Sequence, residues 1–276
     1  MCRLFAMSAG SEPMRATFWL LDAPDSIATQ SHRDPDGTGL GWFDSQRRPH
    51  ISKQPIAAYD DARFAREARE ISSNTFIGHV RYATTGALNV RNTHPFEQDG
   101  RLFAHNGVVA DLPALEAHLG DGMRLVKGYT DSERYFALIT REIAAAGGDV
   151  GAGIRVACNW VAQNLPLVSI NFALATPDGL WALRYPDTDT LFLLEREPGE
   201  PLEKSSSLGT RVHCEAGAER PLVLLASEPL DGDPRWQPLA AGELLHIPQT
   251  LEVSRQMILE HPPAQPPPSR ASPARR

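Results

Sequence analysis

Residues 1–9 read MCRLFAMSA, a short start followed by a largely apolar run. An apolar run of this length is typical of a buried strand, so we expect a β-strand over residues 2–9. The initiator methionine is commonly removed when a small residue follows it, and its removal would leave Cys2 first. A thiolate is a strong nucleophile, and an α-amine with a pKa near ~8 can take the thiol proton at neutral pH. Cys2 alone also fits an ordinary cysteine, so the rest of the chain has to decide between these interpretations.

The composition is that of an ordinary globular protein. The 276 residues are enough for one large domain or two small ones. The net charge of -7 argues against a nucleic-acid-binding surface, and no stretch is apolar enough to predict a membrane span. The N-terminus lacks the layout of a secretory signal. Cys2, Cys158 and Cys214 are too far apart for a disulfide framework, so we expect a cytoplasmic protein.

The order of apolar runs and turn signals predicts helices flanked by blocks of strands. We expect early strands over residues 38–43, 75–82 and 101–105, the last of them ended by the turn signal Asn106-Gly107. Helices are expected over residues 13–21, 59–71, 132–146 and 154–165, with Asp131 as the N-cap of the third. Later strands are expected over residues 168–175, 180–184, 190–194, 222–227 and 243–247. This order favours two sheets with helices outside them.

Two segments are expected to lack regular structure. Residues 195–218 are polar and predict a long loop between strands. Residues 261–276 contain six prolines and no bulky apolar side chain, which predicts a disordered tail with polyproline character.

Three short clusters carry polar groups suited to binding an amino acid. Arg81, in HVRYATTG at residues 79–86, can present a guanidinium fork to a carboxylate. Asn106 and Gly107 can aim an amide and a backbone N–H at one point, as in an oxyanion hole. Asp131, in GYTDSE at residues 128–133, can accept an α-ammonium group. Each cluster alone also fits a plain structural role: a surface arginine, a hairpin turn, a helix cap. Together with Cys2 they form the set needed to bind and hydrolyse glutamine.

Four of these motifs follow one another in the order of a known family. They are Met-Cys at the start, RYATTG at residues 81–86, HNG at residues 105–107 and TDSE at residues 130–133. The chain therefore resembles a class II glutamine amidotransferase, a family with an N-terminal nucleophile. NTHPF at residues 92–96 and ASEPL at residues 226–230 resemble the small, stand-alone bacterial members, among them the ergothioneine-pathway γ-glutamyl amidohydrolases. The resemblance spans residues 2–255, which we expect to be one amidotransferase domain.

The resemblance implies an α+β fold, a four-layer αββα sandwich of two antiparallel sheets with helices outside. It implies that Cys2 is the nucleophile and that Asn106 and Gly107 hold the oxyanion. It further implies that Arg81 and Asp131 bind the glutamyl carboxylate and ammonium groups, and that Thr84 helps to position the glutamyl group. No cofactor and no metal are needed. The segment DGTGLGW at residues 36–42 resembles a glycine-rich segment near the family's pocket, and we assign it no catalytic role.

Three alternatives remain open at this stage. The substrate is either free glutamine, with a separate synthase subunit receiving the ammonia, or a γ-glutamyl conjugate whose own amine leaves. A catalytically silent module that binds glutamine or a γ-glutamyl group is the third. We do not favour a metal site at His79, His94 and His105, because none has a nearby histidine at a ligand spacing.

Overall fold

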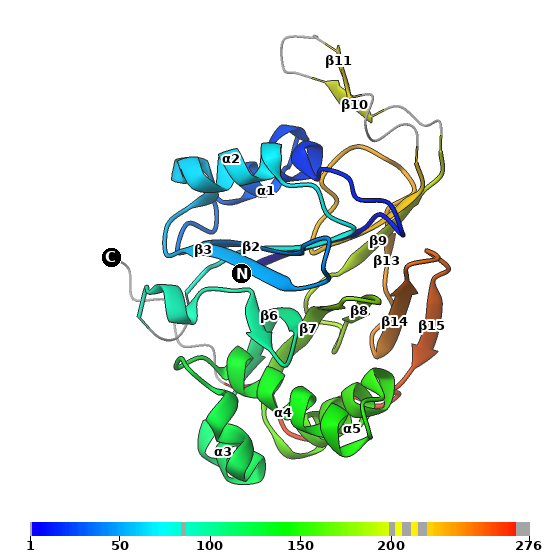
Figure 1. The fold of residues 1–276 in the computed structure, drawn as a ribbon. Helices are drawn as coiled ribbons and strands as arrows, with labels where there is room; N and C mark the ends of the chain where they lie inside the picture. The colour runs from blue at the N-terminus through cyan, green and yellow to red at the C-terminus, as the bar shows by residue number, and fades with distance from the viewer. Residues whose placement is uncertain (1, 84–86, 199–201, 206–210, 215–219, 269–276) are drawn as a thin grey trace.

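The protein is a stack of two antiparallel sheets with helices on both outer sides (Figure 1). The computed structural model describes residues 2–83, 87–198, 202–205, 211–214 and 220–268. Helices α1 (Ile27–Gln30) and α2 (Ala62–Glu70) cover one sheet, and α3 (Leu112–Leu119), α4 (Asp131–Ala145) and α5 (Val150–Asn164) cover the other. This arrangement confirms the predicted four-layer αββα sandwich.

The first sheet places the N-terminal strand near its centre. Within the described residues its strand order is β13-β9-β12-β1-β4-β2-β3, and all neighbours are antiparallel. The strands are β1 (Arg3–Ser8), β2 (Thr38–Phe43), β3 (Pro49–Gln54), β4 (Thr75–Val80), β9 (Phe192–Arg196), β12 (Leu222–Ala226) and β13 (Gln237–Pro238). Because β1 lies between β12 and β4, the strand that follows Cys2 is paired on both sides.

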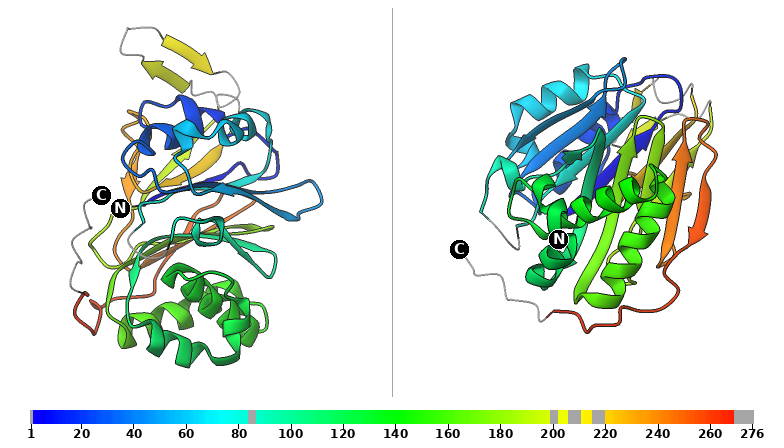
Figure 2. Two further views of the ribbon diagram at one scale, coloured as in Figure 1. Left: turned by 90° about the vertical axis from the view of Figure 1, so that its left-hand side faces the viewer. Right: turned by 60° about the horizontal axis from the view of Figure 1, so that its bottom comes forward.

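The second sheet carries the segment expected to hold the oxyanion. Among the described residues its order is β15-β14-β8-β7-β6-β5. The strands are β5 (Phe96–Gln98), β6 (Arg101–Val109), β7 (Leu167–Thr176), β8 (Gly179–Leu183), β14 (Glu243–Pro248) and β15 (Ser254–Met257). The long strands β6 and β7 are neighbours in this sheet, which faces the first sheet (Figure 2).

The strand periodicity of two divides the apolar side chains into three layers. In β1, Leu4 and Ala6 lie in the core between the sheets, whereas Phe5 and Met7 pack under the helices of the first sheet. A third cluster fills the space between the second sheet and α3–α5. Each large side chain buried in these layers contributes about 1.5–3 kcal/mol relative to exposure.

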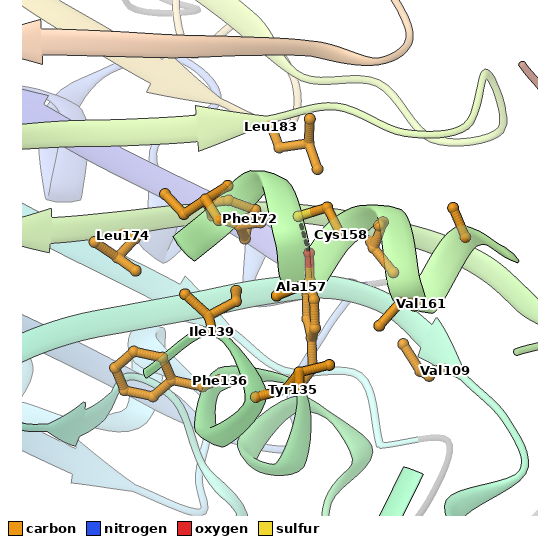
Figure 3. Packing of buried hydrophobic residues seen from close by; sticks show 14 of the residues in the cluster. Val109, Tyr135, Phe136, Ile139, Ala157, Cys158, Val161, Phe172, Leu174 and Leu183 are labelled. Atoms are coloured by element: carbon orange, nitrogen blue, oxygen red, sulfur yellow. Dashed lines mark hydrogen bonds between the residues drawn. The ribbon is translucent and has the colours of Figure 1, made fainter. Parts of the chain in front are cut away.

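Helices α4 and α5 pack side by side against the second sheet (Figure 3). The Tyr135 hydroxyl and the Cys158 thiol lie 3.0 Å apart inside this cluster, and both side chains are fully buried. Burial raises the pKa of the Cys158 thiol to about 12. Cys158 is therefore a protonated core residue, as its helical position predicts.

The start of α4 differs from the expectation. Its N-cap is Thr130, whose side-chain oxygen accepts a hydrogen bond from the Glu133 nitrogen at 3.2 Å. Asp131 is instead the first residue of the helix. The prediction was wrong by one position because Thr and Asp are both good caps and stand next to each other. The shift frees the Asp131 carboxylate from capping.

Three other predicted boundaries are corrected. Residues 13–21 were expected to form a helix, and the structure has a single π-helical turn at Phe18–Asp22. Strand β6 runs through Asn106-Gly107 to Val109, so these two residues do not form a turn. The expected loop over residues 195–218 contains the end of β9 and a two-stranded ribbon, β10 (Leu202–Ser205) and β11 (Arg211–Cys214), which stands out from the body (Figure 1).

The chain beyond β15 runs back along the helical layer. The Tyr185 hydroxyl donates to the His261 carbonyl at 2.8 Å, and the Ala264 nitrogen donates to the Ala162 carbonyl at 2.9 Å. Residues 269–276 of the predicted tail lie outside the described residues. No helix in the described part of the chain is long and apolar enough to cross a membrane.

Candidate active site

Cys2 lies at one end of the space between the two sheets. It directly precedes β1, and the alternation along that strand gives it the same side as Leu4 and Ala6, which fill the inter-sheet core. The Cys2 Sγ accepts a hydrogen bond from the Tyr82 nitrogen at 3.3 Å and lies 3.5 Å from the Tyr82 carbonyl. The side chain is half-buried. The thiol is thus packed against the chain that leaves β4.

Arg81 is the first residue of that exit. It follows Val80 at the end of β4, and the alternation places it on the same face as Ile77, which packs between the sheets. The Arg81 nitrogen donates to the Gly37 carbonyl at 2.8 Å, and Nη1 donates to the Ala87 carbonyl at 3.4 Å. Arg81 is buried, and these hydrogen bonds hold both its backbone and its guanidinium group in position.

Asn106 comes from the facing sheet. It lies in β6 on the same side as Leu102 and Ala104, which belong to the inter-sheet core. Its backbone carbonyl accepts a hydrogen bond from the Ser169 hydroxyl at 2.9 Å, and that hydroxyl also lies 2.7 Å from Asp189 Oδ2. Within the described residues nothing hydrogen-bonds the Asn106 side-chain amide, although the residue is buried. The amide donors therefore stay available to a ligand.

Gly107 is fixed by close contact with β7. A Cβ atom on Gly107 would lie 1.8 Å from the Ser169 carbonyl oxygen, so only glycine fits. Gly107 pairs with Ile170, whose nitrogen donates to Tyr185 on the other side of β7. In an antiparallel ladder this makes the Gly107–Ile170 pair a non-hydrogen-bonded one, so the Gly107 N–H points away from β7. Among the described strands, β5 pairs with β6 only at residues 101–103, so no strand covers this N–H.

Asp131 is held at the start of α4 by the end of β6. Its Oδ2 accepts a hydrogen bond from the Val109 nitrogen at 2.8 Å, and the residue is buried. The next residue, Ser132, places its hydroxyl 2.9 Å from His105 Nδ1. Strand β6 and the N-terminus of α4 are therefore joined on both sides of Asn106.

Electrostatics link three of the predicted residues. Burial lowers the pKa of Arg81, and the charges of Cys2, Asp36 and Asp131 oppose that shift. Burial raises the pKa of the Cys2 thiol to about 11, opposed by the Tyr82 backbone hydrogen bond and by Arg81. The structure thus places Cys2 and Asp131 each within electrostatic range of Arg81. A thiol with this pKa is protonated at neutral pH and needs a base.

Two predicted features are placed differently or not at all. Thr84 lies outside the described residues. The glycine-rich segment, to which the sequence assigned no role, contacts the site directly: the Asp36 nitrogen donates to the Arg81 carbonyl at 2.9 Å, and Asp36 Oδ2 accepts from the Ala83 nitrogen at 2.8 Å. A carboxylate directly before a glycine-rich strand was the available signal. Asp36 is therefore a residue of the site that the sequence analysis missed.

His79, His94 and His105 are all buried, and His79 and His105 are close in sequence to Arg81 and Asn106. The rings of His79 and His94 are tilted against each other, with the ring centroids 4.2 Å apart. His105 contacts Ser132 and the Ser169 carbonyl. Burial lowers the pKa of His79 to about 3, so its ring is neutral. In the described part of the chain no three histidine, cysteine or acidic side chains converge as metal ligands would.

The site combines a thiol, a guanidinium group and a carboxylate in an αββα sandwich. The sequence comparison identifies the family to which a chain with these features belongs. The family model for class II glutamine amidotransferases matches residues 1–271. The chain belongs to the class II glutamine amidotransferases.

The relatives of this amidotransferase include stand-alone bacterial proteins. YafJ of Escherichia coli strain K12, which is classed with the glutamine amidotransferases, is 25% identical over 254 residues, covering 88% of this chain and 96% of YafJ. The γ-glutamyl-hercynylcysteine sulfoxide hydrolase of Mycobacterium tuberculosis is 28% identical over 242 residues, covering 83% of this chain and 86% of the hydrolase.

A solved structure agrees with the fold of the amidotransferase. The glutamine phosphoribosylpyrophosphate amidotransferase of Bacillus subtilis superposes with a TM-score of 0.67 at 18% identity. The match covers 95% of this chain and 50% of the larger enzyme. The described amidotransferase fold therefore corresponds to about half of that protein.

Proposed function

We propose that this amidotransferase hydrolyses the side-chain amide of glutamine, or of a γ-glutamyl conjugate, through a thioester on Cys2. The observation that carries the proposal is that the Cys2 thiol packs against the chain that follows Arg81, while Asp131 is held at the end of the facing strand β6 and its charge acts on Arg81. A cation and an anion near a nucleophile suit the carboxylate and ammonium groups of one amino-acid head group. Thr84 is expected to assist this binding.

The proposed reaction begins with removal of Met1. The free α-amine of Cys2, directly or through a water molecule, takes the thiol proton, and the thiolate attacks the γ-carbonyl carbon. The C=O π electrons move onto the oxygen, which is held by the Asn106 amide and the Gly107 N–H. The tetrahedral intermediate collapses, and the leaving amine takes the proton from the α-ammonium group. Water then attacks the thioester and releases glutamate and the thiol.

The Asn106 and Gly107 roles are supported by how β6 is built. The Asn106 amide has no hydrogen-bond partner among the described residues, and the Gly107 N–H is directed away from the β6–β7 ladder. Two unused donors on consecutive residues can converge on one oxygen. Donors of this kind contribute about 2.7–4 kcal/mol each to transition-state stabilisation.

The identity of the leaving amine stays open between two substrates. The hydrolase relative from Mycobacterium tuberculosis acts on a γ-glutamyl conjugate according to its name, which favours direct cleavage of a conjugate here. A separate synthase subunit that receives ammonia from free glutamine is the other proposal. A cytoplasmic location remains an expectation from the sequence.

The test combines labelling with substrate comparison. An electrophilic glutamine analogue should add one adduct, and peptide mapping should place it on Cys2; Cys2→Ala should prevent it. Turnover of free glutamine, a γ-glutamyl amine and a γ-glutamyl thioether conjugate is then compared in the unmodified enzyme. Absence of both labelling and turnover would favour the catalytically silent binding module.

A further inference from the structure

The ASEPL segment at residues 226–230 holds strand β1, which directly follows Cys2. The Ser227 hydroxyl accepts a hydrogen bond from the Leu4 nitrogen at 2.9 Å, and the Ser227 nitrogen donates to the Leu4 carbonyl at 3.1 Å. Ser227 is buried, so these hydrogen bonds are shielded from water. The segment therefore fixes the backbone two residues after the proposed nucleophile.

The next residue of the segment, Glu228, gathers two arginines. Its Oε1 lies 2.7 Å from Arg3 Nη2, and its Oε2 lies 3.1 Å from Arg33 Nη2. Arg33 is about half exposed, whereas the Arg3 side chain is only 11% exposed. Arg3 is thus the shielded member of this cluster, and its charge interactions are stronger than those of the exposed Arg33.

Arg3 connects this cluster to Cys2 itself. Its Nη1 donates to the Cys2 carbonyl at 3.2 Å and lies 3.6 Å from Asp34 Oδ2. One guanidinium nitrogen therefore touches both the main chain of Cys2 and the carboxylate of Asp34. Because both oxygens contact the same guanidinium nitrogen, the Asp34 carboxylate lies beside the main chain of Cys2.

The Asp34 carboxylate is unusual because it is almost completely buried. Its side chain is 3% exposed. Burial raises its pKa, and the positive charges of Arg3 and Arg33 oppose that shift. Its negative charge also acts on the Cys2 thiol, where it adds to the effect of burial and raises the pKa. By this effect alone, Asp34 would hinder formation of the Cys2 thiolate. Its charge can assist the reaction only if it stabilises another, positively charged group.

We propose that Asp34 and Arg3 form a cradle for the N-terminal residue after Met1 is removed: Arg3 fixes the Cys2 carbonyl, and Asp34 stabilises the α-ammonium group. This deepens the proposed function and rests on it. When the α-amine takes the thiol proton it becomes a cation, and Asp34 holds that cation beside the new thiolate. A carboxylate that orients and stabilises a protonated base is the general arrangement of nucleophile, base and third group.

Other charged groups near Cys2 also affect the thiol and the α-ammonium group. Arg81 faces the thiol and favours the thiolate, but it disfavours a nearby ammonium. The charges of Asp36 and Asp131 act on Arg81 and favour its charged form. Glu228 pairs with Arg3, and Asp34 is the carboxylate of this cluster whose charge acts on Cys2.

The test measures the α-amine directly, without turnover. In a Cys2→Ser background the initiator methionine is still removed, which intact mass verifies, and no thiolate interferes. The rate of N-terminal labelling by an amine-reactive aryl fluoride is followed against pH. Asp34→Asn should lower the α-amine pKa by about one unit, a roughly tenfold change in labelling rate at acidic pH. Asp34→Glu should restore most of the shift, and Asp178→Asn, an exposed carboxylate paired with Arg47, should leave it unchanged.

A measurement on the Cys2→Ser protein itself guards against a variant that fails to fold. Its α-amine pKa in the native state should exceed the value in urea. An equal or lower native value, or an unchanged pKa in a folded Asp34→Asn protein, would overturn the cradle. Because labelling needs no substrate, a shifted pKa in an enzyme that hydrolyses nothing would keep the cradle and reject the proposed function.

The cradle also predicts a kinetic signature. In the enzyme with Cys2 intact, Asp34→Asn should lower kcat with little change in KM, and the acidic limb of kcat/KM should move to lower pH. The sign follows because removing a negative charge lowers the pKa of the groups that must lose a proton. A purely structural role would reduce activity without moving the limb.

Discussion

The Sγ atom of Cys2 lies 3.3 Å from the backbone nitrogen of Tyr82, the residue that follows Arg81. The proposed nucleophile and the proposed carboxylate clamp are therefore joined through one peptide, because β1 and β4 are antiparallel neighbours with Arg3 opposite Val80. Any movement of the chain after β4 changes the position of the thiol and the guanidinium group together.

An N-terminal extension that cannot be removed should silence the enzyme. The extension turns the α-amine of Cys2 into an amide, which cannot accept the thiol proton. Loss of a general base typically costs about 100- to 10,000-fold in rate, so kcat should fall by at least the lower figure. The same sequence attached at the C-terminus is the control. Full turnover by the extended protein would exclude the α-amine as the base.

Arg81→Lys should weaken binding of the glutamyl head group. A lysine keeps the charge but replaces a planar fork by a single point charge. Loss of one charge-assisted hydrogen bond of about 1.5–3 kcal/mol should raise KM by roughly ten- to hundredfold, with a smaller effect on kcat. Steady-state kinetics measure both, and Arg47→Lys at an exposed ion pair is the control. Unchanged kinetics would remove Arg81 from the site.

Asn106→Ala should affect catalysis and Asn171→Ala should affect stability, although the two residues are paired across β6 and β7. Asn106 makes no described side-chain hydrogen bond, so its loss should leave stability nearly unchanged and lower kcat by about 100- to 1,000-fold. Asn171 accepts from the Tyr185 nitrogen at 2.8 Å and donates to the Asp189 carbonyl at 3.0 Å. Its loss should cost about 1–3 kcal/mol of unfolding free energy.

Kinetics and urea unfolding on both asparagine variants separate the two effects. An Asn106→Ala enzyme with normal kcat would reject the oxyanion role. A destabilised Asn106→Ala protein would show instead that the amide serves the fold.

Gly107→Ala should destabilise the fold. The new Cβ would lie 1.8 Å from the Ser169 carbonyl oxygen, so β6 and β7 would have to move apart. Overpacking of this kind costs about 1–3 kcal/mol, and more where backbone blocks the way. Gly232→Ala is the matched control, because nothing lies within 4 Å of its added Cβ. Equal stability of the two variants in urea would contradict the close strand contact.

Truncation should separate the chain end from catalysis. A cut after Pro268 removes only residues outside the described part and should change neither stability nor kcat. A cut after Leu259 also removes the hydrogen bonds made by His261 and Ala264, so it should lower stability by about 1–3 kcal/mol while kcat stays the same. Thermal unfolding and turnover measure the two properties. A large fall in kcat after either cut would place the chain end in the site.

The strands were the elements most accessible to prediction. Residues 38–43 form β2 with the expected boundaries. Backbone approaches this strand closely at Gly39, where a Cβ would lie 2.0 Å from the His94 carbonyl oxygen. Alternating apolar residues and continuous apolar runs are local patterns, so the sequence alone contains them. The four-layer fold followed from the order of these runs and from the resemblance.

Boundaries set by tertiary contacts were not accessible. Asn106-Gly107 has the local signature of a turn, yet β7 pairs with it and extends β6 to Val109. Residues 195–218 look polar throughout, yet two parts of the segment pair as β10 and β11. In both cases a partner strand far away in the sequence supplies the hydrogen bonds, which local propensity does not contain.

The sequence by itself determined the family, the two-sheet architecture and the residue types of the site, because motif order and strand periodicity are written along the chain. Only the tertiary structure decided that Asp36 supports the chain after Arg81, that the Gly107 N–H is left out of its ladder, and that Asp34 and Glu228 surround the start of the chain through Arg3. The physical reason is that burial, strand register and charge proximity join residues up to 225 positions apart, as between Arg3 and Glu228, and no local pattern encodes which of them meet.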